Sequence, residues 1–196
     1  FTVQVNDGHG GLASQNVVIT VNGTEDKPVV TSGSQSGAVT EIADNAAGEN
    51  ATVHHQSDTI TFTDVDLSDA ETGSVTSRQV TSATLANGYT LTAAQQNALL
   101  NAFTIDAATH SQANGTGTVG WHYDISDSAL DFLGDDDQLT LTFTVQVNDG
   151  HGGLASQNVG IPVHGTEDQP GVTSGSQTGA VTGIGAKAAG GNRPGH

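Results

Sequence analysis

The stretch LTLTFTVQV, residues 139–147, alternates strictly between apolar and polar side chains. Its apolar positions are Leu139, Leu141, Phe143, Val145 and Val147. Successive side chains on a strand point to opposite faces of the sheet. The run therefore predicts a β-strand with one buried face and one polar face.

The same alternation recurs along the chain, in TVGWHYDI at 118–125, DTITFTD at 58–64 and VVITV at 17–21. Turns rich in Gly and Asp separate these segments, and NDGHGG at 6–11 and 148–153 is the clearest of them. Short alternating strands with such turns are typical of an all-β antiparallel sandwich. Its predicted core contains Trp121, Phe62, Phe143 and Val145.

One short helix is predicted within this β pattern. The segment TAAQQNALLNAF at 92–103 consists of good helix formers, and Thr92 with Gln95 forms a capping box at its start. A single helical turn is predicted in DSALDFL at 127–133, with Asp127 as its N-cap.

An internal repeat determines the domain frame. Residues 1–44 and 143–186 differ at nine of 44 positions, which leaves 35 identities, and such a repeat indicates a tandem array. The proline-containing segments GTEDKPVV and GTEDQPGV are interpreted as linkers, because proline cannot continue a strand ladder. The expected units are strands of a preceding repeat at 1–22, a linker at 23–26, a complete repeat at 27–165, the next linker and the start of a following repeat at 166–182, and a degenerate tail at 183–196.

The charge balance limits the classes of partner. The chain has 21 acidic residues against four Lys and Arg, a net charge of −17. Nucleic-acid binding requires clustered cations, and so does attraction to an anionic membrane surface, so neither partner is expected. With this negative charge, a cation is the expected kind of binding partner.

Other absences exclude further classes. The sequence has no Cys, so a disulfide framework and a thiolate metal site are excluded. No apolar run approaches the roughly 18 residues that a membrane span requires, and membrane insertion is not expected. No G-x-S-x-G, P-loop or H-E-x-x-H motif is present, and we expect no enzymatic activity.

Several motifs together resemble a VCBS repeat, a bacterial domain of long tandem arrays in secreted RTX-type adhesins. The run DSALDFLGDDDQLTLTFTVQVNDGHGG and the linker GTED resemble the end of that repeat, and GAVTEIAD and TITFTDVDLSD resemble its beginning. The wider similarity is to cadherin-like domains. The resemblance implies an antiparallel Ig/cadherin-like β-sandwich, type I secretion to the bacterial cell surface, and Ca²⁺ bound between neighbouring repeats.

Calcium needs several oxygen ligands converging from separate loops. The acids of the first linker, of FTDVD and of VNDG offer such ligands. The resemblance to cadherin-like domains implies one set of ligands at one pole of the domain and another set at the opposite pole. The first set is Glu25, Asp26, Asp64, Asp66 and Asp149, and the second is Glu41, Asp131, Glu167 and Asp168.

Simpler interpretations stand beside the calcium hypothesis. DVDLSDAE is not an EF-hand, because Asp69 occupies the position where glycine is required. The run Asp135, Asp136 and Asp137 is interpreted as a solvated face or turn, and the simpler interpretation of Asp149 is that it sets the NDG turn. No pair of the eight His residues has zinc-site spacing, so they are interpreted as exposed loop residues.

Three functions remain open at this point. The first is a calcium-stiffened extender repeat of a surface adhesin, mainly monomeric, with neighbouring repeats as partners and any polysaccharide bound through other domains. The second is a polysaccharide- or ligand-binding module, which would require exposed aromatic residues, and the third is a non-catalytic spacer of a secreted enzyme.

Both terminal segments carry expectations of their own. Residues 1–22 copy 143–164 without the rest of a sandwich, and two strands alone are marginal in water. We expect them to be loose or paired onto a sheet edge, with strand exchange between chains as a minor alternative. The tail is rich in small residues and is expected to be disordered.

Overall fold

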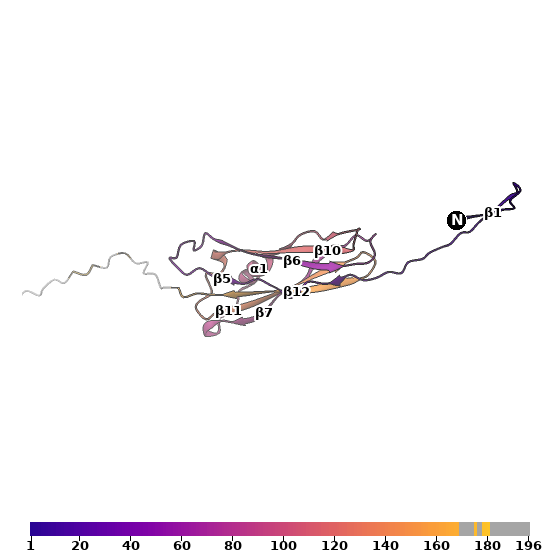
Figure 1. Ribbon diagram of the computed structural model, residues 1–196. Helices are drawn as coiled ribbons and strands as arrows, with labels where there is room; N and C mark the ends of the chain where they lie inside the picture. Colours follow the sequence, from indigo (N-terminus) through magenta and orange to yellow (C-terminus); the bar gives the residue numbers. More distant parts are fainter. Residues whose placement is uncertain (169–174, 176–177, 181–196) are drawn as a thin grey trace, which may run out of the picture.

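A computed structural model describes residues 1–168, 175 and 178–180. Its central part is an elongated sandwich of two β-sheets, with the chain entering at one end and leaving at the other (Figure 1). The predicted disorder of the tail concerns residues that lie outside the described ones.

The first sheet has the strand order β3-β6-β10-β8, and β9 also pairs with β10. Its strands are β3 (Val29–Val30), β6 (Val53–Thr63), β8 (Phe103–Ile105), β9 (Thr109–His110) and β10 (Thr116–Ser126). All pairings in this sheet are antiparallel.

The second sheet has the order β4-β12-β11-β7, and β5 also pairs with β12. Its strands are β4 (Gln35–Ser36), β5 (Val39–Thr40), β7 (Thr72–Thr84), β11 (Gln138–Asn148) and β12 (Leu154–His164). The long strands are antiparallel, whereas β4 and β5 run parallel to β12.

This strand order is that of an immunoglobulin-like sandwich. If β3 is strand A, then the first sheet is A-B-E-D, and the second places C, F and G beside each other. The first strand is divided between the sheets, since β3 pairs with β6 while β4 and β5 pair with β12. The predicted all-β sandwich is therefore confirmed, with two short parallel pairings at one edge.

The alternating sequences bury the faces expected of them. In β11 every apolar residue from Leu139 to Val147 is buried and the intervening residues are partly exposed. The predicted core residues Trp121, Phe62, Phe143 and Val145 are each at most 1% exposed. The rings of Phe103 and Phe143 stack with centroids 4.2 Å apart between the two sheets.

Trp121 also meets the polar requirement of its buried ring. Its Nε1 donates a hydrogen bond of 2.8 Å to Oε1 of Gln35, a residue of β4 that is 8% exposed. A buried indole N–H without a partner would be costly. The bond therefore joins the first strand to the core of the sandwich.

The predicted helix is present as α1 (Ala93–Asn101), and the capping box of Thr92 and Gln95 is confirmed. Its Leu99 is fully buried against the core. Two short 3₁₀ turns, η1 (Ala86–Gly88) and η2 (Asp127–Ala129), complete the elements. The prediction that Asp127 is an N-cap was wrong, because Ser126 is the N-cap and has no side-chain capping bond.

The N-terminal segment forms a separate two-stranded hairpin, β1 (Thr2–Asn6) and β2 (Leu12–Asn16), which projects from the sandwich (Figure 1). Its register pairs Thr2 with Asn16, as β11 and β12 pair Thr144 with Asn158. The two strands pair with each other and with no edge of the sandwich. The repeated sequence thus adopts the same local pairing with and without a second layer.

Candidate metal centres at the two ends of the sandwich

Three aspartates lie together in the loop between β6 and β7. Asp64, Asp66 and Asp69 offer carboxylate oxygens within 4.8 Å of one another. The loop is folded on itself, because the backbone N–H of Asp66 donates to Oδ1 of Asp64 and that of Asp69 donates to the carbonyl of Asp66. We call the end of the sandwich that contains this loop and the linker 23–26 the linker end.

Buried oxygens at the linker end have no hydrogen-bond donor. They include Oδ2 of Asp64, Asp69 and Asp149, whose residues are 2%, 7% and 1% exposed, and Oε1 of Glu71, which is 8% exposed. Leaving a buried carboxylate oxygen without a partner costs about 1–3 kcal/mol of folding free energy, and more when the group is charged. A bound cation is the ordinary way to satisfy several such oxygens at once.

Asp149 has two separable roles. Its Oδ1 accepts the backbone N–H groups of His151, Gly152 and Gly153 at 2.7, 3.0 and 2.9 Å, which fixes the turn between β11 and β12. Burial opposes ionisation, but these bonds outweigh it and hold the pKa of Asp149 below its usual value. Asp149 is thus ionised at neutral pH, with Oδ1 used by the turn and Oδ2 unpartnered.

The linker reaches this loop through its backbone. The N–H of Asp26 donates to Oδ2 of Asp66 over 2.6 Å, while the Asp26 side chain is exposed. Glu25 turns toward the turn after β11, where its Oε1 lies 3.9 Å from Nδ1 of His151. The two predicted linker residues are therefore both at the linker end, but Asp26 contributes its backbone and not its carboxylate.

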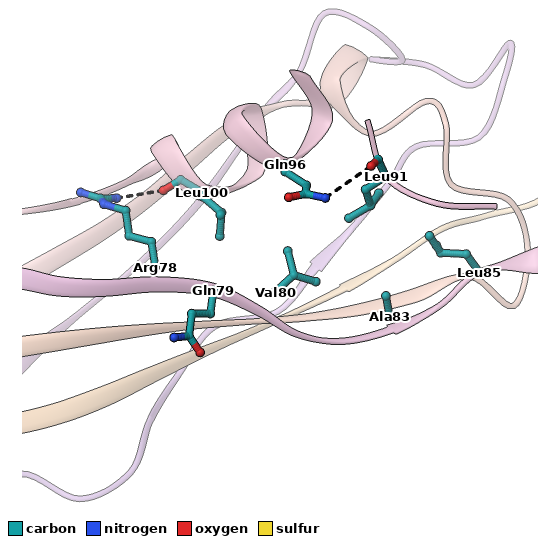
Figure 2. A pocket seen from close by; sticks show the side chains of 8 residues that line it. All are labelled: Arg78, Gln79, Val80, Ala83, Leu85, Leu91, Gln96 and Leu100. Atoms are coloured by element: carbon teal, nitrogen blue, oxygen red, sulfur yellow. Dashed lines mark hydrogen bonds between the residues drawn. The ribbon is translucent and has the colours of Figure 1, made fainter. Parts of the chain in front are cut away.

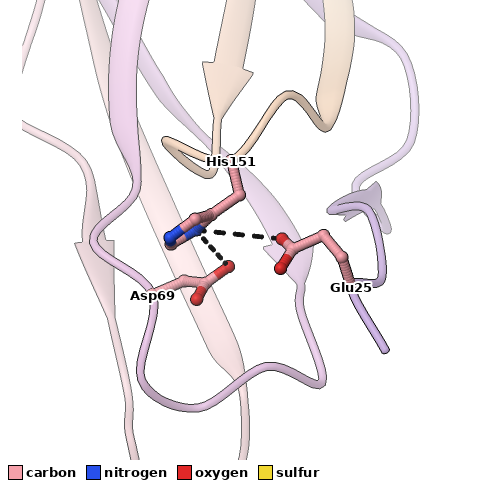
Figure 3. Close-up of side chains that lie close together, drawn as sticks. All are labelled: Glu25, Asp69 and His151. Atoms are coloured by element: carbon pink, nitrogen blue, oxygen red, sulfur yellow. Dashed lines mark ion pairs between the residues drawn. The ribbon is translucent and has the colours of Figure 1, made fainter. Parts of the chain in front are cut away.

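A group of side chains that could hold a metal ion forms where the linker, the β6–β7 loop and the β11–β12 turn meet (Figure 3). It consists of Glu25, Asp69 and His151, and Nδ1 of His151 lies 3.4 Å from Oδ2 of Asp69. The charge of Asp69, followed by that of Glu25, raises the pKa of His151 above its usual value. Loss of water, followed by the charge of Asp69, raises the pKa of Glu25.

A second histidine is buried nearby. Nδ1 of His110, in β9, lies 2.8 Å from Oε2 of Glu71, and these side chains are 5% and 0% exposed. Burial raises the pKa of Glu71, although the charge of His110 opposes this rise. The interpretation of the histidines as exposed loop residues was wrong for His110, because its strand faces the loop that precedes β7.

The opposite end of the sandwich, which we call the far end, has its own carboxylates. Oxygens of Glu41, Asp127 and Asp131 lie within 4.8 Å of one another. Oε2 of Glu41 accepts both the backbone N–H and the hydroxyl of Thr166, and Oδ1 of Asp168 accepts the N–H of Asp44 at 2.8 Å. Three of the four residues predicted for this end are thus near one another, and Glu167 is exposed and outside the group.

Negative charge accumulates at the far end. Burial raises the pKa of Glu41, with a further contribution from the charge of Asp168. Burial also raises the pKa of Asp131, and the charges of Asp127 and Asp168 add to the effect. The residues present would suit a cation there, but their hydrogen bonds already use several of the oxygens.

Asp127, Asp69 and His151 are members of these groups that were not predicted as ligands from the sequence. Asp127 is fully buried, and it accepts from the backbone N–H groups of Ile42 and Asn50, each at 2.9 Å, and lies 2.8 Å from Nε2 of His54. The side chain of His54 is 14% exposed, so the exposed interpretation was wrong there too. Asp127 directly precedes SALDFL, whose Leu130 and Leu133 are buried, and this position beside a buried segment was the available signal.

The run of three aspartates after η2 also differs from its prediction. Asp135 and Asp136 are exposed as expected, but Asp137 is 6% exposed. Its Oδ1 accepts the N–H of Ala86 at 2.6 Å, and Oδ2 accepts that of Gly134 at 3.1 Å. Asp137 therefore holds two loops together.

An open groove lies between β7 and α1, with a volume of about 470 Å³ (Figure 2). Arg78 crosses it to donate to the carbonyls of Leu100 and Phe103 at 2.8 and 2.6 Å. The groove is lined by Arg78, Gln79, Val80, Ala83, Leu85, Leu91, Gln96 and Leu100. This lining contains no aromatic side chain on which a sugar ring could stack.

No protein-family model matches this chain, and no curated protein sequence matches it either. Solved structures with partial similarity include the following two. One contains zebrafish RET cadherin-like domains 1 to 4, with 16% identity and a TM-score of 0.37, over 84% of this chain and 33% of that one. The other is AggA, the major subunit of aggregative adherence fimbriae type I from Escherichia coli, with 12% identity and a TM-score of 0.33, over 73% of this chain and 99% of that one.

The chain thus spans about a third of the length of the RET structure. Because both TM-scores are below 0.5, the assignment of the sandwich depends on the strand order of this chain and not on these similarities. Among the described residues, no helix is long and apolar enough to span a membrane.

Proposed function

We propose that this chain is a calcium-binding extender repeat of a secreted bacterial surface adhesin, of the VCBS type that its motifs resemble. The observation that carries the proposal is the set of buried, unpartnered oxygens of Asp64, Asp69 and Asp149 at the linker end. Neighbouring repeats of the same chain are its proposed partners, and it has no proposed catalytic role.

The chemistry of the donor set fits calcium. Ca²⁺ takes six to eight oxygen ligands at about 2.3–2.6 Å, so ligand oxygens on one ion can be up to about 5 Å apart. The oxygens of Asp64, Asp66 and Asp69 lie within 4.8 Å of one another, and they come from carboxylates. Without a cation, this concentration of like charge in a buried loop would oppose folding.

Ordering of the linker is the proposed consequence of binding. Asp66 accepts the backbone N–H of Asp26, so the same loop holds both the carboxylate group and the linker. Neutralising the loop would relieve repulsion around this contact and fix the direction in which the preceding repeat enters. The module would then act as a stiff spacer outside the cell.

The far end is a weaker candidate for a second ion. Glu41, Asp131 and Asp168 supply the negative charge. Burial first, and neighbouring negative charge after it, raises the pKa values of Glu41 and Asp131. Both oxygens of Asp127 already accept hydrogen bonds from the protein. We therefore place the first calcium ion at the linker end.

The test compares Asp64→Asn with Asp58→Asn. Asp58 is an exposed carboxylate on β6, so its replacement makes the same change of charge away from the loop. Calcium should raise the melting temperature of the unmodified chain, because a ligand at 100 times its Kd stabilises the folded state by about 2.7 kcal/mol. Asp64→Asn should lose most of this increase and Asp58→Asn should keep it.

Calorimetric titration with Ca²⁺ measures the calcium affinity of the same two variants directly. Superimposable melting curves of the unmodified chain in calcium and in chelator would contradict the proposal. Equal losses in the two variants would show that calcium acts through net charge and not through this loop.

A further inference from the structure

The group of Glu25, Asp69 and His151 differs from the other carboxylate groups because it includes a nitrogen donor. The three residues come from separate segments: the linker, the β6–β7 loop and the β11–β12 turn (Figure 3). They meet only when the sandwich is folded and the linker is in place. This convergence is what a metal site requires, and a surface charge run lacks it.

The distances favour a shared ion over direct hydrogen bonding. Nδ1 of His151 is 3.4 Å from Oδ2 of Asp69 and 3.9 Å from Oε1 of Glu25. A hydrogen bond between imidazolium and carboxylate would be about 2.7–2.9 Å long. Ligand atoms around a tetrahedral zinc ion, each about 2.0–2.2 Å from the metal, lie roughly 3.4 Å apart.

The burial of Asp69 provides an independent indication of a ligand. The residue is 7% exposed, its side chain is 4% exposed, and Oδ2 has no hydrogen-bond donor. This is the oxygen that faces His151. By contrast, Glu25 and His151 are exposed enough, at 44% and 58% of their side chains, for an ion to reach them from solvent.

We propose that Glu25, Asp69 and His151 form a site for a borderline transition-metal cation of the Zn²⁺ class, with water completing the coordination. Imidazole nitrogen with two carboxylates is a donor set that zinc accepts, whereas calcium in proteins takes oxygen ligands. The site adds Glu25 and His151, which the calcium site proposed above does not use. Asp69 is common to both groups, so occupancy of one site would alter the other.

The repeat provides a matched control for the histidine. His9 occupies the same position of the same NDGHGG turn in the β1–β2 hairpin, where its Nδ1 lies 3.0 Å from the carbonyl of Asp7. Neither Glu25 nor Asp69 is grouped with it. His151→Gln removes the imidazole from a turn that faces the proposed ligands Glu25 and Asp69. His9→Gln removes it from the same local turn where those ligands are absent.

The experiment uses the full chain without an affinity tag, titrated with Zn²⁺ by calorimetry and with Co²⁺ by visible absorption. We expect one saturable Zn²⁺ and a Co²⁺ spectrum of tetrahedral type, with affinity reduced at least tenfold in His151→Gln and unchanged in His9→Gln. Glu25→Gln should also weaken Zn²⁺ binding. Because Glu25 lies in the linker and its side chain is 44% exposed, this change should leave the fold intact.

Absence of saturable zinc binding in the unmodified chain would overturn the proposal, as would equal affinities in His9→Gln and His151→Gln. A Ca²⁺ titration of His151→Gln separates the two sites. If His151→Gln binds calcium but not zinc, the result supports two sites. Failure of the unmodified chain to bind zinc would contradict the zinc proposal and leave the calcium proposal standing.

Discussion

Asp124 and Asp127 are close in sequence, and each contacts a histidine of β6, yet their surroundings differ. Asp127 is fully buried and accepts hydrogen bonds from two backbone N–H groups as well as facing His54. Asp124 lies 2.7 Å from Nδ1 of His55, but these side chains are 50% and 71% exposed. The first pair joins three segments of the chain, and the second lies on the surface.

We expect Asp127→Asn to lower the free energy of unfolding by about 3 kcal/mol, because the amide places N–H donors against N–H donors in a buried site. Asp124→Asn should change it by less than about 0.5 kcal/mol, since exposed ion pairs contribute little. Urea denaturation of both variants measures the difference. An effect of Asp127→Asn as small as that of Asp124→Asn would mean that the contacts of Asp127 are not important for stability.

At this scale the sequence predicted the members of the candidate site better than their surroundings. Asp64, Asp66 and Asp149 were selected because carboxylates at strand ends suit calcium, and all three lie at the linker end. His151 was not selected as a ligand, because its partners Glu25 and Asp69 come from distant segments. Asp69 was considered only as the residue that breaks the EF-hand pattern, although it lies in the same loop as Asp64 and Asp66. Burial of a polar side chain depends on the tertiary fold, and short motifs do not encode it.

At the scale of the elements, the strands with strong alternation were predicted and those without it were not. β7 is 13 residues long, but it is an edge strand with few apolar positions. Its pairing with β11 is also shifted between Thr140 and Leu141 and between Thr144 and Val145, which disturbs the period of two. The two-residue strands β3, β4 and β5 are too short to show a pattern, and only their neighbours define them.

Two strand glycines illustrate how closely the elements pack. A Cβ at Gly117 in β10 would lie 2.1 Å from Cζ of Phe62 and 2.6 Å from the carbonyl oxygen of Thr109, whereas a Cβ at Gly160 in β12 would meet nothing within 4 Å. Gly117→Ala should therefore destabilise the sandwich by about 1–3 kcal/mol, and Gly160→Ala should be neutral or slightly stabilising. Thermal denaturation of the two variants tests this, and a neutral Gly117→Ala would show that Phe62 can move aside.

At the scale of the whole molecule, the two copies of one sequence provide a controlled comparison. Phe1 is 87% exposed in the hairpin, and its equivalent Phe143 is 0% exposed in the sandwich. Phe143→Ala should cost about 3–5 kcal/mol because it leaves a cavity between the sheets, whereas Phe1→Ala should cost almost nothing. Deleting 1–22 should likewise leave the melting temperature unchanged.

Chemical denaturation of the two Phe variants and thermal denaturation of the deletion variant, each monitored by the fluorescence of the buried Trp121, measure these effects. A large loss of stability on deletion of 1–22 would mean that the first copy, and not the second, completes the sandwich. Equal effects of Phe1→Ala and Phe143→Ala would indicate that the two copies exchange places.

The division of the first strand between the sheets has a mechanical consequence. The chain enters and leaves at opposite ends of the sandwich, so tension on the two ends acts along its length (Figure 1). The first strands run parallel to the last one, and the N–H of Gly37 bonds to the carbonyl of Gly160 at 3.1 Å while that of Glu41 bonds to His164 at 2.9 Å. These bonds lie across the direction of pull and are loaded in shear, so they must rupture together. Strands of only two residues therefore set the force that the molecule withstands before it begins to extend.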